Sequence, residues 1–360
     1  MTTAPEKGLN KSDLFILGGG GLAVVLTGIA HYAQWNNIAT FCFAALAVTL
    51  LASLVGRSVE QLGDRFGPGA TGVLQSALGN LPELFIAIFA LKAGLVDVVR
   101  AALIGSILAN LLLVLGLAFI VGGLKHGIQK LDSGRARISV SLMLLSVIVM
   151  TIPSLAHWVH TPAEPHETAF SVVVSVVLLV LFLLYLPASL KHGSKSISPE
   201  NGHGEPPRWP LWLALTLLAL SAVLAAFVSD WFVTALEPAM KALNISDAFA
   251  GLVIVAVAGN AIENVVGIQL ASKGQSEYAF SVIINSPLQI ALVLAPLLVI
   301  LSQVFGFSPL TLVFSPMLTA CMFLSVILAA FISFDGESNW LEGAALTAIY
   351  IVIATAFWWG

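Results

Sequence analysis

Leu78-Gly79-Asn80-Leu81-Pro82-Glu83 has a counterpart in the second half of the chain, Ala258-Gly259-Asn260-Ala261-Ile262-Glu263. The offset that aligns these two motifs also aligns Ser106 with Ser286. Both copies place a carboxylate in an apolar stretch that is long enough to cross a bilayer. Because burying a charge in a bilayer is costly, an acidic residue inside a membrane span indicates a functional site. Two such acids in matching halves of one chain are typical of a transporter built from repeats.

The composition excludes a soluble globular domain. Of 360 residues, 58% are hydrophobic and only 9% are charged, which is typical of a polytopic membrane protein. The net charge of -4 says little about partners, because most charges must lie in loops, and we expect no nucleic-acid partner. Cys42 and Cys321 fall inside predicted spans and give no disulfide framework. The first apolar run, residues 14–33, is too long for a signal peptide, and we expect it to be retained as a membrane helix.

Eleven stretches satisfy the requirement of about 20 mostly apolar residues per membrane helix. They are residues 14–33, 37–56, 69–91, 97–121, 136–157, 168–189, 209–229, 248–271, 277–302, 308–332 and 339–358. The second span should continue as an amphipathic helix through Arg65, until Pro68 and Gly69 end it. The sequence therefore predicts an all-α polytopic membrane protein with 11 transmembrane helices.

The basic residues indicate the orientation of these helices. Twelve of the 15 Lys and Arg residues fall on the side of the N-terminus, and only Lys92, Arg100 and Lys241 fall on the other side. Since the positive side is normally cytoplasmic, we expect the N-terminus in the cytoplasm and the C-terminus outside. The compact termini favour the cell (inner) membrane of a prokaryote.

The longest polar loop divides the chain after the sixth span. Residues 191–208 are rich in Ser, Gly, Pro and His. This composition predicts a flexible cytoplasmic linker. The remaining parts are an N-terminal segment with the first helix (1–36), a first five-helix repeat (37–190) and a second one (209–360). Because five is odd, the two repeats should have opposite orientations, the inverted geometry of alternating-access carriers.

Polar residues at helical spacing accompany the two acids. Asn80 and Glu83 share one helix face, as do Asn260 and Glu263, because residues three and four apart are neighbours on a helix. Pro82 removes a backbone donor and so frees a carbonyl of the preceding turn. The two flanking spans each add a hydroxyl and an amide, namely Ser106 with Asn110 and Ser286 with Gln289.

These oxygen atoms favour a hard cation such as Ca²⁺, which takes six to eight oxygen ligands. The polar faces of these spans contain no Cys or His, which argues against zinc or copper. One Ca²⁺ or two protons would neutralise Glu83 and Glu263 equally well. Moving the empty, charged site through an occluded state would cost several kcal/mol per ion. Only loaded forms should therefore cross, which makes exchange obligatory. Ca²⁺ is then the substrate, and we expect no cofactor.

Both motifs resemble those of the Ca²⁺/H⁺ antiporters (cation exchangers), a family of the Ca²⁺/cation antiporter superfamily. Residues 77–84 with 105–116 are similar to the first repeat motif of that family, and residues 257–263 with Ser286 and 289–290 to the second. The resemblance extends to residues 229–238 and 335–343. It implies an eleven-helix, inverted-repeat exchanger in which Glu83 and Glu263 bind Ca²⁺, supported by Asn80, Asn260, Asn110 and Gln289.

A few positions differ from the family pattern. Asn264 follows the second glutamate where a His is usual, residues 285–287 read Asn-Ser-Pro in place of Gly-Ser-Ser, and Asp230 stands where Glu is commoner. Asp230 and Glu60 are candidate acids of the access path. An ordinary helix end explains Asp230, and an amphipathic helix face explains Glu60, equally well.

Three other functions are compatible with parts of the pattern. A Na⁺/Ca²⁺ or Na⁺/H⁺ exchanger could use the same scaffold. In Na⁺/Ca²⁺ exchangers, however, a Gly-Thr-Ser type element typically precedes the glutamate. Here Gly-Asn precedes it in both copies, which favours protons as the coupling ion. An intramembrane hydrolase could use two acids, but the chain shows no nucleophile, so we do not expect an enzyme. A channel would lack coupling to a pH gradient.

Overall fold

The structure is a computed structural model that describes residues 8–66, 78–131, 133–195, 208–334 and 336–359. Within these ranges, the structure describes only the backbone of residues 63–66, 133–136, 188–195 and 261–263. Among the described residues, nine helices are long and apolar enough to cross a membrane, or ten if a pair bent near Asn260 forms one span. This confirms a helical, polytopic membrane protein. The chain divides into a first unit, Met1–Phe89 with Phe182–Ala242, and a second unit, Ala90–Leu181 with Leu243–Gly360.

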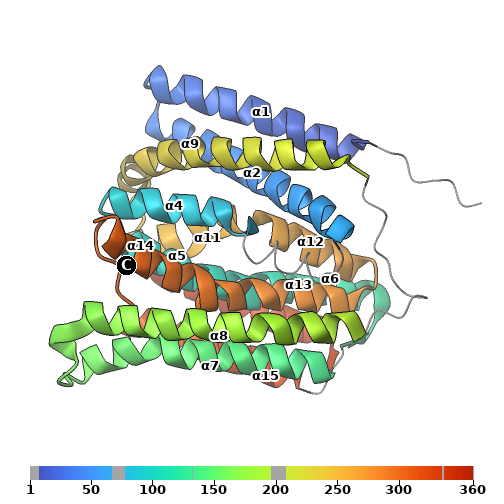
Figure 1. Ribbon diagram of the computed structural model, residues 1–360, viewed down its shortest axis with the longest axis vertical. Helices are drawn as coiled ribbons and strands as arrows, with labels where there is room; N and C mark the ends of the chain where they lie inside the picture. The colour runs from blue at the N-terminus through green and yellow to red at the C-terminus, as the bar shows by residue number, and fades with distance from the viewer. Residues whose placement is uncertain (1–7, 67–77, 132, 196–207, 335, 360) are drawn as a thin grey trace, which may run out of the picture. The chain divides into compact units, whose positions relative to one another are not determined.

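The first unit is built around three long helices, α1 (Lys11–Tyr32), α2 (Asn37–Phe66) and α9 (Leu211–Leu243). It also takes in the start of α4 (Leu81–Lys92) and the end of α8 (Glu167–Lys195). Helix α1 packs along α2, and α9 runs beside them (Figure 1). A cluster of buried apolar side chains joins α2 to the start of α9, namely Leu54, Leu62, Trp209, Ala214 and Leu217.

A buried carboxylate joins the beginnings of α1 and α9 to α2. Asp13 is only 1% exposed. It accepts hydrogen bonds from the guanidinium of Arg57 and from the indole Nε1 of Trp209, the latter at 3.2 Å, and it lies 3.9 Å from the guanidinium of Arg208. The attraction between buried opposite charges offsets their loss of hydration only when the contacts are close. Arg57 and Arg208 are only partly buried, so the network serves mainly to link the beginnings of α1 and α9 to the Arg57 turn of α2.

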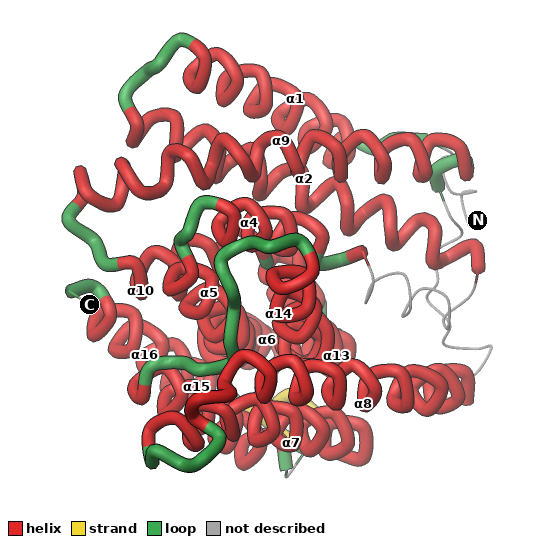
Figure 2. Tube along the Cα trace, turned by 60° about the vertical axis from the view of Figure 1, so that its left-hand side comes forward, coloured by secondary structure: helices red, strands yellow, loops and turns green. Residues whose placement is uncertain are grey.

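The second unit holds the other helices and the two short strands (Figure 2). Its elements up to the start of α8 are α5 (Val96–Leu108), η1 (Ala109–Val114), α6 (Leu115–His126), β1 (Gln129–Lys130), α7 (Ser133–Trp158) and η2 (Glu164–His166). Those after α9 are α10 (Asp247–Phe249), η3 (Ala250–Val255), α11 (Ala256–Gly259), α12 (Ala261–Ser272), α13 (Ser276–Gln289), η4 (Ile290–Leu294), α14 (Ala295–Val304), α15 (Pro316–Ser333), β2 (Glu337–Ser338) and α16 (Trp340–Phe357). Strands β1 and β2 pair antiparallel, with Gln129 opposite Ser338. Segments η1, η3 and η4 are π-helical, and η2 is a 3₁₀ turn.

Several elements begin at matching positions in the two halves of the sequence. Helices α4, α5 and α6 precede α12, α13 and α14 by the same offset that separates the two glutamate motifs. Helices α4 and α12 both have 12 residues. Each is followed by a glycine with left-handed backbone, Gly94 (φ +84°) and Gly274 (φ +77°). The π-helical segments η1 and η4 begin within one position of this offset, at Ala109 and Ile290. The internal repeat of the sequence therefore reappears as a repeat of local structure.

Helix boundaries differ from the predicted spans in several places. The predicted span 248–271 is not continuous, because helix α11 ends at Gly259 and the chain bends by 61° before α12 continues. Helix α9 runs on to Leu243, well beyond residue 229. Helix α8 reaches Lys195, inside the predicted linker, of which residues 196–207 lie outside the described ranges. The same holds for residues 67–77, which include the start of the predicted span 69–91.

Residues 308–315, predicted as part of a span, are not helical. Helix α15 begins only at Pro316, where the Ser315 side chain accepts a hydrogen bond from a backbone N–H of the first turn. Three buried serines accept hydrogen bonds from the backbone of this stretch at 3.0–3.1 Å, one from each of three helices: Ser302 from Leu310, Ser171 from Leu312 and Ser154 from Phe314. Non-helical backbone at membrane depth is tolerated where protein groups satisfy its hydrogen-bonding groups. The three serine hydroxyls satisfy backbone N–H groups of this stretch.

Two glycines allow α5 and η3 to approach closely. A Cβ atom added to Gly105 would lie 2.3 Å from the carbonyl oxygen of Leu252, and one added to Gly251 would lie 2.3 Å from that of Val98. Both distances are far below a normal contact, so neither glycine can be replaced without moving a backbone.

Changing Gly105 to alanine is therefore expected to destabilise the second unit by about 1–3 kcal/mol, the usual cost of overpacking. The measurement is the thermal unfolding midpoint of the protein in detergent. The matched control is Gly21→Ala in α1, where an added Cβ would meet nothing within 4 Å and alanine is the better helix former. Equal midpoints for the two variants would contradict the close approach of α5 and η3.

Candidate ion-binding site

Four of the residues singled out by the sequence meet in the second unit. Ser106, Asn110, Asn260 and Ser286 are all at most 3% exposed. The Asn260 amide donates to the Ser106 hydroxyl at 2.9 Å, and the Ser286 hydroxyl donates to the Asn260 amide oxygen at 3.1 Å. The Asn110 amide donates to the Ser286 hydroxyl at 3.3 Å and to the Asn260 amide oxygen at 3.5 Å. These residues form one connected network, which we call the polar cluster.

Helix packing explains why residues so far apart in sequence meet. The glycine contacts between α5 and η3 bring Ser106, next to Gly105, close to Asn260, which follows α11. The π-helical segment η1 begins one residue before Asn110, and α13 packs against η1. Because π-helical turns occur often at functional sites, the position of η1 beside the polar cluster fits a binding role.

Two amide oxygens near Asn260 lack a hydrogen-bond donor among the described residues. The side chain of Asn110 is fully buried, yet its Oδ1 atom has no partner. Asn264 lies in the first turn of α12, four residues after Asn260, and its buried Oδ1 also has no partner. An unsatisfied buried acceptor costs about 1–3 kcal/mol. Amide oxygens are ligands that Ca²⁺ accepts, so each of the two is a candidate ligand.

The first glutamate lies in the other unit. Glu83 is 2% exposed and occupies the first turn of α4, directly after a break at Gly79 and Asn80. Asn80 is half-buried. The positive end of a helix dipole stabilises a carboxylate charge. Residue 263 has the corresponding place in α12, but the side chain of Glu263 lies outside the described residues.

The structure also describes three further predicted residues. Gln289 is half-buried at the end of α13, three residues after Ser286. Glu60 on α2 and Asp230 on α9 are exposed and belong to the first unit. Asn264 was not among the predicted site residues. Its spacing of four from Asn260 was the signal that could have identified it.

Nearly the whole chain is similar to known proteins. The family described as sodium/calcium exchanger protein matches residues 36–191 and 213–359. A Ca(2+)/H(+) antiporter from Aphanothece halophytica is 36% identical over 365 residues, covering 97% of either chain. The Ca(2+)/H(+) antiporter ChaA of Bacillus subtilis is 35% identical over 348 residues, covering 95% of this chain and 98% of that one.

A solved structure of native YfkE superimposes with a TM-score of 0.82 at 33% identity, covering 95% of this chain and 99% of that one. The resemblance inferred from the two glutamate motifs is thus confirmed by matches along nearly the whole chain. The protein belongs to the sodium/calcium exchanger family.

Proposed function

We propose that this protein exchanges Ca²⁺ for H⁺ across a membrane by alternating access. The observation that carries the proposal is the 36% identity to a Ca(2+)/H(+) antiporter over 97% of either chain. Antiport is transport rather than catalysis of a covalent reaction, so the protein would need no cofactor, and Ca²⁺ is its substrate.

In this mechanism Glu83 and Glu263 are the groups that Ca²⁺ and protons share. Glu83 lies buried in the first turn of its helix. Its charge there would need a bound cation or a proton to neutralise it. The polar cluster would supply neutral oxygens, among them the Asn110 Oδ1, which has no hydrogen-bond partner among the described residues. Further oxygens would come from Asn80 and Gln289. Glu60 and Asp230 would line the access paths.

The same proposal includes the full architecture. One N-terminal helix (1–36) would precede two inverted five-helix repeats, 37–190 and 209–360, joined by a cytoplasmic linker at 191–208. The equal offsets between α4–α6 and α12–α14 support the repeat. The excess of basic residues on the N-terminal side supports a cytoplasmic N-terminus and an external C-terminus. The proposed location is a prokaryotic cell membrane.

Purified protein in vesicles with an internal pH dye tests this function. An outward proton movement that requires Ca²⁺ uptake, and Ca²⁺ uptake that requires a proton gradient, are the expected results. Ca²⁺ moving downhill without any counter-ion would contradict exchange and indicate a channel. Na⁺ competing at fixed pH, with Ca²⁺ uptake driven by a Na⁺ gradient, would instead support the Na⁺/Ca²⁺ alternative.

Changing Asn110 to alanine should raise the Ca²⁺ concentration for half-maximal exchange roughly tenfold, since losing one ligand oxygen costs on the order of 1.4 kcal/mol. The assay is the vesicle measurement above, run over a Ca²⁺ series. Ser146→Ala is the control, because this buried hydroxyl bonds only the Leu142 carbonyl of its own helix among the contacts described. Half-saturation equal in Asn110→Ala and wild type would exclude Asn110 as a ligand.

A further inference from the structure

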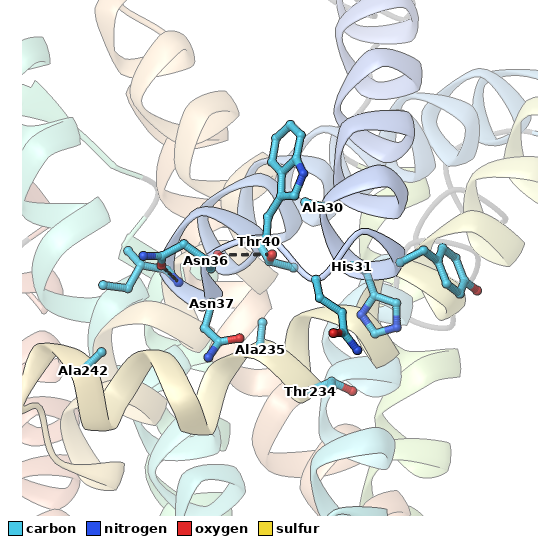
Figure 3. Close-up of a pocket in the computed structure, with 12 residues that line it drawn as sticks. Ala30, His31, Asn36, Asn37, Thr40, Thr234, Ala235 and Ala242 are labelled. Carbon is cyan, nitrogen blue, oxygen red and sulfur yellow. Dashed lines mark hydrogen bonds between the residues drawn. The ribbon is translucent and has the colours of Figure 1, made fainter.

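A polar cavity of about 790 Å³ lies in the first unit, and none of the residues of the two glutamate motifs lines it among the described residues. The turn between α1 and α2 forms one wall, and the second half of α9 forms the other (Figure 3). The lining residues are Ala30, His31, Tyr32, Gln34, Trp35, Asn36, Asn37, Ile38, Thr40, Thr234, Ala235 and Ala242. The proposed exchange gives this cavity no role.

The cavity lies at the level of a membrane surface. Helices α1, α2 and α9 are each long and apolar enough to span a bilayer, and the cavity is lined at the end of α1, the start of α2 and the last turns of α9. Tyr32 is 76% exposed and Trp35 is 44% exposed. Exposed Trp and Tyr at span ends are typical of the headgroup layer. We therefore expect lipid headgroups at the mouth of the cavity.

The lining chemistry favours a ligand without net charge. None of the twelve described lining residues is Lys, Arg, Asp or Glu. A ligand with net charge would lose hydration there without meeting an opposite charge, which is unfavourable. The lining offers instead three side-chain amides (Gln34, Asn36, Asn37), while the hydroxyls of Thr40 and Thr234 already donate to the backbone carbonyls of Asn36 and Asp230.

Aromatic rings supply a second kind of contact. The His31 ring stacks on Trp231 with centroids 5.7 Å apart, and Tyr32 meets Trp231 edge to face at 5.8 Å. These contacts hold His31 and Tyr32 in place beside the cavity. Ring faces attract alkylammonium groups, while side-chain amide N–H groups donate to phosphate oxygens. Amides and rings together match a headgroup that carries both a phosphate and an ammonium.

We propose that this cavity binds the zwitterionic headgroup of a membrane phospholipid, one that carries a phosphate and an ammonium group. The amides of Asn37 and Gln34 would contact the phosphate, and the rings of Trp35 and Tyr32 would contact the ammonium. The acyl chains would leave the cavity along the apolar outer surface of the three helices. A lipid held there bridges the α1–α2 turn and α9.

The test titrates detergent-purified full-length protein with short-chain phosphatidylethanolamine, phosphatidylglycerol, a glucosyl diacylglycerol or free phosphoethanolamine, and follows the thermal unfolding midpoint. Phosphatidylethanolamine should raise the midpoint at a concentration about tenfold lower than the other three. Thr234→Phe fills the cavity from an exposed position on α9, and Asn37→Ala removes one amide without filling it. Each should raise the concentration required about tenfold.

Asn244→Gly is the matched control, because this exposed amide lies outside the cavity lining and its backbone has φ +51°, which glycine adopts freely. It should respond like the wild type. An equal response of wild type, Thr234→Phe and Asn37→Ala would overturn the site. An equal effect of the phosphatidylglycerol or glucosyl lipid would overturn the zwitterionic choice. Free phosphoethanolamine acting as strongly as the lipid would overturn a membrane source.

Discussion

Glu83→Gln is expected to lower Ca²⁺-driven proton movement about a hundredfold or more while leaving the protein folded. The side chain is 2% exposed in the first turn of α4, so water screens the charge of the carboxylate only weakly. Glutamine has nearly the same shape but can neither neutralise a divalent cation nor carry a proton. Loss of a buried charge partner costs about 3–5 kcal/mol, and 1.4 kcal/mol is a factor of ten in binding.

The vesicle exchange assay measures this effect, together with Glu263→Gln and the double variant. If both acids serve one site, the double variant should be no more defective than either single one. Glu237→Gln is the control, since Glu237 is an exposed carboxylate of α9 that pairs with Lys241 at 2.6 Å, and it should exchange normally. Exchange by Glu83→Gln at more than about a tenth of the wild-type rate would be incompatible with the proposed shared site.

Asp13→Ala is expected to destabilise the protein by about 1–3 kcal/mol, because it removes a buried, hydrogen-bonded carboxylate. Arg57, which would lose this partner, is 29% exposed and can partly hydrate its charge. The indole N–H of Trp209 would also lose its acceptor. Asp13 further belongs to a capping box at the start of α1, in which its backbone N–H and its side chain both bond Asn10. Loss of this cap adds to the effect.

Thermal unfolding in detergent checks this prediction, and a fall of the midpoint by several degrees is expected. The chain contains a matched pair that should behave differently. Asp97 also bonds an arginine, Arg100, at 3.1 Å, but its side chain is 77% exposed. An exposed pair contributes at most about 1 kcal/mol, so Asp97→Ala should leave the midpoint nearly unchanged. Similar shifts for Asp13→Ala and Asp97→Ala would mean that the burial of Asp13 adds nothing to stability.

The four residues of the polar cluster, though not their contacts, could be singled out from the sequence because spacing relates them. Ser106 and Asn110 are one turn apart, and the common offset of the two motifs led from Ser106 to Ser286 and from Asn80 to Asn260. Helical periodicity and an internal repeat need no tertiary information. The tertiary partners themselves, such as the bond from Asn260 to Ser106, depend on the glycine contact between α5 and η3, which no pattern in one sequence indicates.

The helix break before α12 could not be read from hydropathy. Pro82 suggested a break in the first copy, but Ile262 stands at that place in the second copy, and α12 still begins at Ala261. The shared Gly-Asn pair, rather than the proline, therefore accompanies both breaks. A single glycine within an apolar run is a weak signal of a break, so the continuous span was the natural prediction.

Residues 308–315 were mistaken for a helix because their apolar side chains resemble a span. What distinguishes them is that their backbone hydrogen bonds go to serines of other helices, among them Ser154 and Ser171. Such long-range partners leave no periodic signal near the stretch itself. The buried network around Asp13 escaped prediction for the same reason, since Arg57 and Trp209 are 44 and 196 residues away from it.

The paired π-helical segments η1 and η4 bear on the origin of the chain. A π-helical turn holds one residue more than an α-helical turn, so each segment represents an added residue. Both occur at the same place in their half of the sequence, within one position of the common offset. Under the proposed duplication, the simplest history is that a half-length ancestor already carried the extra residue before its gene was copied and fused to itself.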